Sequence, residues 1–188
     1  SDLLTDKLEK TNEGYALAKI IGLKMTDYIS NDTDYNYKTI IPCNLFGPND
    51  NFDINFGHMI PSVMHKIHLA KTNNDKMVTI WGDGNSRREF MYIKDLIDFI
   101  YYSIENIQKL PNFINVGVGS DYTINEYYKM ISKVIGYKGN YKFDLSKPQG
   151  MKRKLVDISL LNDLGWKHKY QVEVGLEETY KFYEQNYE

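Results

Sequence analysis

The chain contains 188 residues, enough for one sizeable hydrophobic core or for a core with a small lobe. With 42% hydrophobic residues, 26% charged residues and a formal net charge of −2, its composition excludes disordered and fibrous proteins. The three arginines lie in two short clusters, and the 16 tyrosines are not interleaved with basic residues. We therefore expect no nucleic-acid partner, because such a partner requires a broad basic face.

Cys43 is the only cysteine, so no disulfide can form within the chain, and this favours a reducing compartment. No apolar run approaches the roughly 18–20 residues that span a bilayer, and residues 1–10 lack the apolar core of a signal peptide. These features predict a cytoplasmic protein without a membrane partner.

The first expected helix begins near Thr11–Asn12 and runs to about Tyr28, with apolar residues at helical spacing. Residues 38–43 predict a strand buried on both faces, as in parallel sheets. Residues 44–57 are rich in Asn, Asp, Gly and Pro, and irregular segments of this length usually serve a function. The other elements expected in this half are a helix over 59–71 and a strand over 77–81.

The second half continues the alternation of strands and helices. Gly82 and Gly84 predict a turn, because glycine tolerates positive φ. Thr123 and Glu126 predict a capping box that opens a helix to about residue 135. The other expected elements are a helix over 95–107, a strand over 113–116, a short helix from Ser159 closed by Gly165, and a final helix with a stripe at Leu176, Tyr180, Tyr183 and Tyr187. The alternation predicts an α/β fold with a parallel sheet.

The sequence contains no GxGxxG fingerprint, the glycine-rich turn that holds the phosphates of a dinucleotide. Gly82/Gly84 and Gly117/Gly119 are isolated pairs, and neither opens a helix in the required way. This observation leaves two alternatives. Either the protein does not use a dinucleotide, or the phosphate-binding loop lies in a part of the protein that precedes Ser1.

Tyr15 and Lys19 are four residues apart in the run YALAK, so on a helix their side chains share one face. A lysine ammonium beside a phenol stabilises the phenolate, and such a pair suits a tyrosine that gives a proton to a carbonyl oxygen. In a chain with 16 tyrosines, chance alone predicts roughly 1.7 such pairs. The spacing therefore carries little weight without its context.

Six sequence blocks supply that context: TNEGYALAKIIGLKM, PCNLFGPNDNF, GHMIPSVMHKIH, IWGDGNSRREFMYIKDL, NVGVGSDYTINE and RKLVDISLLNDLGW. In order and spacing they resemble the extended short-chain dehydrogenase/reductase family. Within it they resemble the GDP-L-fucose synthase group, which comprises GDP-4-keto-6-deoxy-D-mannose 3,5-epimerase-4-reductases. The resemblance covers nearly the whole chain and matches the C-terminal part of that family. The resemblance implies that a glycine fingerprint, a catalytic serine and a nearby catalytic cysteine precede this chain.

The resemblance implies an NADP cofactor and a GDP-sugar substrate. Tyr15 is then the general acid at C4 of the 4-keto sugar, and Lys19 assists Tyr15 and holds the nicotinamide ribose. His58 matches a histidine that exchanges protons at C3 and C5, and it also belongs to the cofactor contacts. The alternative for His58 is a histidine that is only hydrogen-bonded at a helix start. The loop expected to run along the nicotinamide comprises Pro42, Cys43, Asn44 and Leu45.

Four further residues match substrate-binding positions of the family. Arg88 can grip a diphosphate through its fork of donors. Trp81 offers a flat face to sugar or base, and Lys66 adds a second cation. Asp157 can accept hydrogen bonds from hydroxyl groups. The plainer interpretation of each residue is a surface charge or a packed aromatic side chain, and no metal ligands are expected.

The expected fold is the later part of a Rossmann-type parallel sheet with a smaller C-terminal substrate-binding lobe. Residues 1–49 and 91–118 are assigned to the sheet domain, and residues 50–90 and 119–188 to the lobe. We expect a homodimer from the resemblance, and no turnover by this chain alone. Three alternatives stay open: a C4-reductase of a related GDP-4-keto sugar such as a heptose, an NAD-dependent 4-epimerase or 4,6-dehydratase, and a non-catalytic sugar-nucleotide-binding module.

Overall fold

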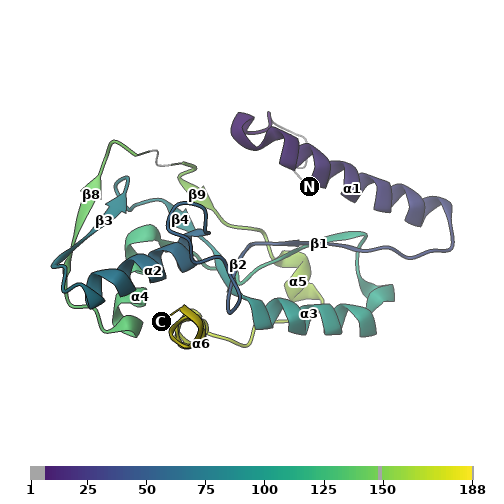
Figure 1. The fold of residues 1–188 in the computed structure, drawn as a ribbon. Helices are drawn as coiled ribbons and strands as arrows, with labels where there is room; N and C mark the ends of the chain where they lie inside the picture. Colours follow the sequence, from purple (N-terminus) through teal and green to yellow (C-terminus); the bar gives the residue numbers. More distant parts are fainter. Residues whose placement is uncertain (1–6, 148–149, 188) are drawn as a thin grey trace.

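The structure is a computed structural model that describes residues 7–147 and 150–187. Helices and strands alternate along most of this range (Figure 1). The helices are η1 (Lys10–Asn12), α1 (Glu13–Asp32), α2 (Met59–Thr72), α3 (Ile93–Glu105), η2 (Ile107–Lys109), α4 (Ile124–Ile135), α5 (Ser159–Asp163) and α6 (Val172–Tyr187). The strands are β1 (Thr39–Pro42), β2 (Asn44–Phe46), β3 (Met77–Trp81), β4 (Arg87–Arg88), β5 (Phe90–Tyr92), β6 (Phe113–Val116), β7 (Tyr122–Thr123), β8 (Asn140–Asp144) and β9 (Arg153–Lys154).

Parallel pairing dominates the strands, which confirms the predicted α/β class. Strand β1 pairs with β6, β2 with β5, and β3 with β8, all in parallel. Strand β4 lies at the centre of a small three-stranded sheet, antiparallel to β7 and parallel to β9. Because β1 and β2 follow each other directly, the pairs β1–β6 and β2–β5 lie next to one another (Figure 1).

The predicted capping box and the predicted glycine turn are confirmed, whereas Asn12, at the start of α1, makes no side-chain cap hydrogen bond. The Thr123 hydroxyl accepts the backbone N–H of Glu126 at 3.1 Å, and the Glu126 carboxylate accepts the N–H of Thr123 at 2.6 Å. This reciprocal pair is a capping box, and it satisfies two backbone donors that the first turn of α4 would leave free. Gly82 and Gly84 have φ of 72° and 73°, in the left-handed region that glycine adopts without strain.

Two expectations differ from the structure. Residues 38–43 were expected to be buried on both faces, but β1 is only half-buried because β6 is its one partner within the described residues. The segment 44–57, expected to be irregular throughout, begins with strand β2. Strands β4, β5, β7, β8 and β9 were not predicted, and four of them contain only two or three residues, too few to give a period-2 pattern.

Buried side chains form two hydrophobic clusters. The first joins α2, α4 and α6 and includes Ile67, Ile131 and Leu176, which are fully buried. The second joins α3, α5 and β6, with Phe99 packed edge-on against Trp166 at a ring separation of 5.2 Å. Helix α1 lies on the opposite side of β1 from α3 (Figure 1), and Leu23 is its one buried residue. None of the described helices combines the length and the apolar character needed to cross a membrane.

Candidate active site

One large pocket, of about 1130 Å³, lies between α1, the β1–β2 segment, the loop before α2, and strands β4 and β9. Side chains of both hydrophobic clusters line it, among them Cys43 from the second cluster and Phe46 and Val63 from the first. The pocket brings together ten of the eleven residues that the sequence predicts for the site: Tyr15, Lys19, Pro42, Cys43, Asn44, Leu45, His58, Lys66, Trp81 and Arg88.

Tyr15 and Lys19 lie on one face of α1, as their spacing predicts. The Lys19 Nζ atom is 5.4 Å from the centroid of the Tyr15 ring. The Tyr15 side chain is 69% exposed, so its phenol is open to the pocket rather than packed in a core. The geometry permits a proton donor with a neighbouring cation.

The segment from Pro42 to Leu45 connects β1 to β2 and lines the pocket. The Cys43 N–H donates to the Val116 carbonyl at 2.8 Å, and the Asn44 side-chain amide donates to the Glu89 carbonyl at 2.7 Å. Burial, together with the nearby Glu89 charge, raises the pKa of the Cys43 thiol to about 12. The thiol is therefore protonated at neutral pH, which agrees with the expectation that Cys43 is not a catalytic cysteine.

The loop between β2 and α2 is held by its own aspartate and asparagine side chains. Asp53 Oδ1 accepts the backbone N–H groups of Asn55 and Phe56 at 2.7 and 2.8 Å, and its carbonyl accepts the N–H of Gly57 at 2.9 Å. A Cβ atom at Gly57 would lie 2.2 Å from the Asn51 carbonyl oxygen, so this close approach requires glycine. Such side-chain-to-backbone bonds fix a segment that has no regular structure.

This loop delivers His58 to the rim of the pocket, at the residue that precedes α2. The His58 Nδ1 atom lies 3.4 Å from Asp50 Oδ1. The side chain of His58 is 80% exposed, whereas that of Asp50 is 16% exposed. A histidine held at one nitrogen and open at the other can act as a proton acceptor and donor at neutral pH.

Lys66 and Trp81 line the pocket together and form what we call its aromatic wall. Lys66 Nζ donates to the Thr79 carbonyl at 3.1 Å and lies 5.3 Å from the centroid of the Trp81 ring. Burial lowers the pKa of Lys66. A second ammonium, that of Lys147, also lies 5.3 Å from the Trp81 ring. This wall combines a flat aromatic face with positive charge.

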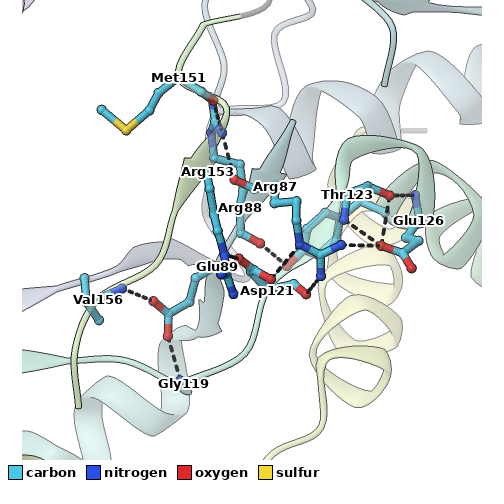
Figure 2. Close-up of polar contacts among 11 residues, drawn as sticks. Arg87, Arg88, Glu89, Gly119, Asp121, Thr123, Glu126, Met151, Arg153 and Val156 are labelled. Carbon is cyan, nitrogen blue, oxygen red and sulfur yellow. Dashed lines mark hydrogen bonds and ion pairs between the residues drawn. The ribbon is translucent and has the colours of Figure 1, made fainter. Parts of the chain in front are cut away.

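Arg88 of β4 lines the pocket, whereas its neighbour Arg87 does not. Figure 2 shows their side chains pointing in different directions. The Arg88 guanidinium donates to the backbone carbonyls of Arg87 and Met151 at 2.7 and 2.6 Å, so neutral acceptors hold it in place. Arg87 instead donates to Asp121 Oδ1 at 2.8 Å and to the Asp121 carbonyl at 2.6 Å. Of the two arginines, Arg88 is the one that can bind an anion in the pocket.

Two buried carboxylates, those of Asp121 and Glu89, hold the chain around Arg87 and Arg88 (Figure 2). The Asp121 side chain, 2% exposed, also accepts Arg153 Nε at 2.5 Å. The side chain of Glu89, which is fully buried, accepts the backbone N–H groups of Val118, Gly119 and Val156 at 2.7, 2.8 and 3.0 Å. These bonds tie β4 to the segment after β6 and to the segment after β9.

Asp157 is the predicted site residue that does not line this pocket. Its Oδ1 atom accepts the backbone N–H and the hydroxyl of Ser159 at 2.8 and 2.6 Å, which places it at the entry of α5. These hydrogen bonds lower the pKa of Asp157. The expected contact of Asp157 with the substrate stays a prediction.

Three residues of the site were missed by sequence reasoning. Lys154 lines the pocket and is paired with Arg88 in the β4–β9 register. Its signal was the second basic cluster, Arg153–Lys154, which mirrors Arg87–Arg88. Asp50 had a weak signal, as one acid in a loop rich in polar residues. Glu89 had none, because a buried carboxylate with backbone partners has no sequence pattern.

Comparison with known proteins identifies the group to which this architecture belongs. The sequence model of the NAD dependent epimerase/dehydratase family matches residues 1–117. A GDP-L-colitose synthase from Yersinia pseudotuberculosis is 54% identical over 96% of this chain, and a GDP-L-fucose synthase from Azorhizobium caulinodans is 45% identical over 97%. The chain spans 59% and 58% of the length of these two relatives.

The same group contains solved structures of this fold. The GDP-mannoheptose C4 reductase from Campylobacter jejuni, solved with NADP bound, superposes with a TM-score of 0.85 at 30% identity. The match covers 97% of this chain and 63% of that protein. The sequence match, the relatives and the shared fold lead to one conclusion: this chain belongs to the NAD dependent epimerase/dehydratase family.

Proposed function

We propose that the protein is an NADP-dependent epimerase/reductase that acts on a GDP-4-keto-6-deoxy sugar. One observation carries the proposal. A single pocket joins the Tyr15–Lys19 pair, the histidine His58 and the cation Arg88, each with the function that its chemistry allows. The relatives named as GDP-L-colitose synthase and GDP-L-fucose synthase support the choice of a GDP-sugar.

The pocket fits the nicotinamide end of the proposed cofactor. Lys19 offers an ammonium donor to ribose hydroxyl groups, and the segment from Pro42 to Leu45 lines the same pocket. The NADP-bound reductase from Campylobacter jejuni supports the choice of NADP. When bound, NADPH supplies the reducing equivalent for C4 of the sugar. The glycine fingerprint for its phosphates is absent from the sequence of residues 1–188.

In the proposed reaction, Tyr15 gives its phenolic proton to the C4 oxygen as that carbonyl is reduced to an alcohol. The Lys19 ammonium stabilises the phenolate that is left behind. His58 removes and returns protons at the carbons next to the C4 carbonyl, whose C–H bonds the carbonyl acidifies. Arg88 and Lys66 bind the diphosphate, and Trp81 stacks on the sugar or the base. Asp157 as a substrate ligand stays a prediction, and the pocket lining, which does not include it, does not favour it.

A C4-reductase of a GDP-heptose, without epimerase activity, is the second candidate. The likeness to GDP-mannoheptose C4 reductase favours it. Epimerase and reductase are distinguished by proton exchange at the carbons beside C4, because plain reduction requires none.

We also propose the division of the chain into residues 1–49 with 91–118, as part of the cofactor domain, and 50–90 with 119–188, as the sugar lobe. The two hydrophobic clusters support a division in two. Trp166, just after α5, packs on Phe99 of the proposed cofactor domain. This contact does not favour the assignment of the region around α5 to the sugar lobe. The cytoplasmic location and the homodimer both stay predictions. The exposed apolar side chains Leu17, Ile21 and Met25 of α1 support the homodimer.

The test is the substitution Tyr15→Phe in protein expressed from its complete coding sequence. Loss of a positioned general acid should slow C4 reduction by about 10²–10⁴-fold and leave GDP binding nearly unchanged. The reaction is followed by loss of NADPH absorbance with a panel of GDP-4-keto sugars. Tyr28→Phe, on the same helix and outside the pocket lining, is the matched control. Reduction by the Tyr15 variant at more than half the unmodified rate would contradict the assignment.

A further inference from the structure

The carboxylate of Asp50 is fixed before any substrate binds. Its Oδ1 atom accepts the backbone N–H of Asn51 at 2.8 Å, and the side chain is 16% exposed. The same oxygen lies 3.4 Å from Nδ1 of His58, whose ring is 80% exposed. Both residues line the pocket. A shielded, anchored acceptor therefore faces one nitrogen of an open imidazole.

This contact constrains where the imidazole carries its proton. A neutral histidine has one N–H donor and one bare nitrogen acceptor. Two acceptors repel each other at this distance, so the contact favours Nδ1 as the N–H donor toward the Asp50 carboxylate. The bare nitrogen is then Nε2. Carboxylates elsewhere fix histidine tautomers in the same way when they bond the second ring nitrogen.

The backbone of the loop holds the two residues in this relation. The His58 carbonyl accepts the N–H of Ser62 at 3.0 Å, which anchors His58 to the first turn of α2. Asp53 bonds the backbone of the loop from within, and Gly57 allows the chain to close on Asn51. These bonds fix the backbone that carries the two residues, and the contact with Asp50 orients the His58 ring.

We propose that Asp50 is a positioning residue that holds His58 as its Nδ1–H tautomer and so presents Nε2 as the base for proton exchange on the sugar. The inference rests on the proposed function for its chemical meaning. The Nε2 lone pair takes the proton from a carbon beside the C4 carbonyl, and the C–H electron pair moves into an enolate. The imidazolium then carries both N–H groups, with the Nδ1–H donated to Asp50. Return of the Nε2 proton to carbon restores the ketone and the starting tautomer.

The tautomer is measured directly, without substrate, by ¹⁵N NMR of histidine-labelled protein at a pH about two units above the ordinary histidine pKa. We expect the His58 signals to report Nδ1–H in the unmodified protein. In Asp50→Asn the amide can turn its NH₂ toward Nδ1, so the Nδ1–H population should fall by more than half. Asp34→Asn is the matched control, because Asp34 is an exposed aspartate outside both this loop and the pocket lining. Nε2–H as the main form in the unmodified protein, or no change in Asp50→Asn, would overturn the inference.

The consequence for catalysis is measured in protein from the complete coding sequence, incubated with the keto sugar and NADP⁺ in D₂O. We expect Asp50→Asn to slow deuterium incorporation by about 10–100-fold, as for loss of other second-layer carboxylates, with C4 reduction changed much less. Equal loss of both activities would contradict a positioning role specific to His58. If the unmodified protein incorporates no deuterium, the proposed epimerisation fails, and with it the role as base. The tautomer measurement still decides the Asp50–His58 contact.

Discussion

Arg87 and Arg88 are chemically identical neighbours, yet β4 turns their side chains in different directions. Successive residues of a strand point to opposite faces, so one guanidinium meets Asp121 and the other meets the pocket. The same alternation separates Arg153, which bonds Asp121, from Lys154, which lines the pocket. In each basic pair, one residue therefore binds Asp121 within the small sheet and the other lines the pocket.

We predict that Arg88→Ala weakens binding of GDP by roughly 10–150-fold, the equivalent of about 1.5–3 kcal/mol for hydrogen bonds to a charged group. Titration calorimetry with GDP and with the keto-sugar nucleotide measures this effect. Arg87→Ala is the control, and it should lower stability while changing the GDP dissociation constant much less. If only the keto-sugar nucleotide suffers in Arg88→Ala, then Arg88 contacts the sugar and not the diphosphate.

Sequence reasoning at the residue scale succeeded where the chemistry was local or where a motif placed it. Tyr15 and Lys19 share a face because helix geometry dictates it. Asp157 shows what a local pattern leaves open. An aspartate two residues before a serine can bond that serine's backbone N–H, and Asp157 does so through Oδ1, while its contact with the sugar stays a prediction. The pairing of Asp50 with His58 spans eight residues of irregular chain, which no period describes.

At the element scale, the long helices and the strands over 39–42, 77–81 and 113–116 could be predicted, because each carries its own apolar pattern. The two-residue strands β4, β7 and β9 could not. They form because Asp121, just before β7, gathers Arg87 and Arg153 from segments more than thirty residues away. Their stability is a property of a non-local ion cluster rather than of strand propensity.

We expect this cluster of Asp121, Arg87 and Arg153 to make the free energy of unfolding depend on pH. Hydrogen bonding and the charge of Arg153, followed by Arg87, lower the pKa of Asp121 below its ordinary value of 3.8. A carboxylate whose folded pKa is depressed contributes stability above its unfolded pKa, and this contribution is lost as pH falls through the folded pKa. We therefore expect Asp121→Asn to be less stable than the unmodified protein at pH 7, with the difference shrinking below about pH 4.

Urea unfolding at a series of pH values from 7 to about 3 measures this difference. Asp32→Asn, at the end of α1, serves as the control for loss of one negative charge. The prediction is wrong if the stability difference between Asp121→Asn and the unmodified protein stays constant down to the lowest pH. A constant difference would mean that folding does not lower the pKa of Asp121.

At the scale of the whole molecule, the pocket is the boundary between two hydrophobic clusters. The first cluster, which joins α2, α4 and α6, contributes Phe46, Val63 and Phe90 to the pocket lining. The second cluster contributes Cys43. A change in how the two clusters sit together must therefore alter the pocket. Cys43, as the single cysteine of the chain, is a natural reporter of that boundary.

We predict that the Cys43 thiol is nearly inert toward a thiol-specific disulfide reagent in the native protein. The side chain is 8% exposed, and burial, with the charge of Glu89, raises its pKa to about 12. The thiolate is the reactive form, so at pH 8 a pKa near 12 leaves about one thiol in 10⁴ ionised, against roughly a quarter for a free cysteine. Ionisation alone should slow the reaction by about 10³-fold, and burial should slow it further. Raising the urea concentration should restore fast labelling at the global unfolding transition.

The control is Met25→Cys combined with Cys43→Ser, which places the thiol on the exposed face of α1 and should react at once. Native Cys43 reacting as fast as that control would mean that the two clusters separate readily, and that the pocket between them is not a fixed cavity.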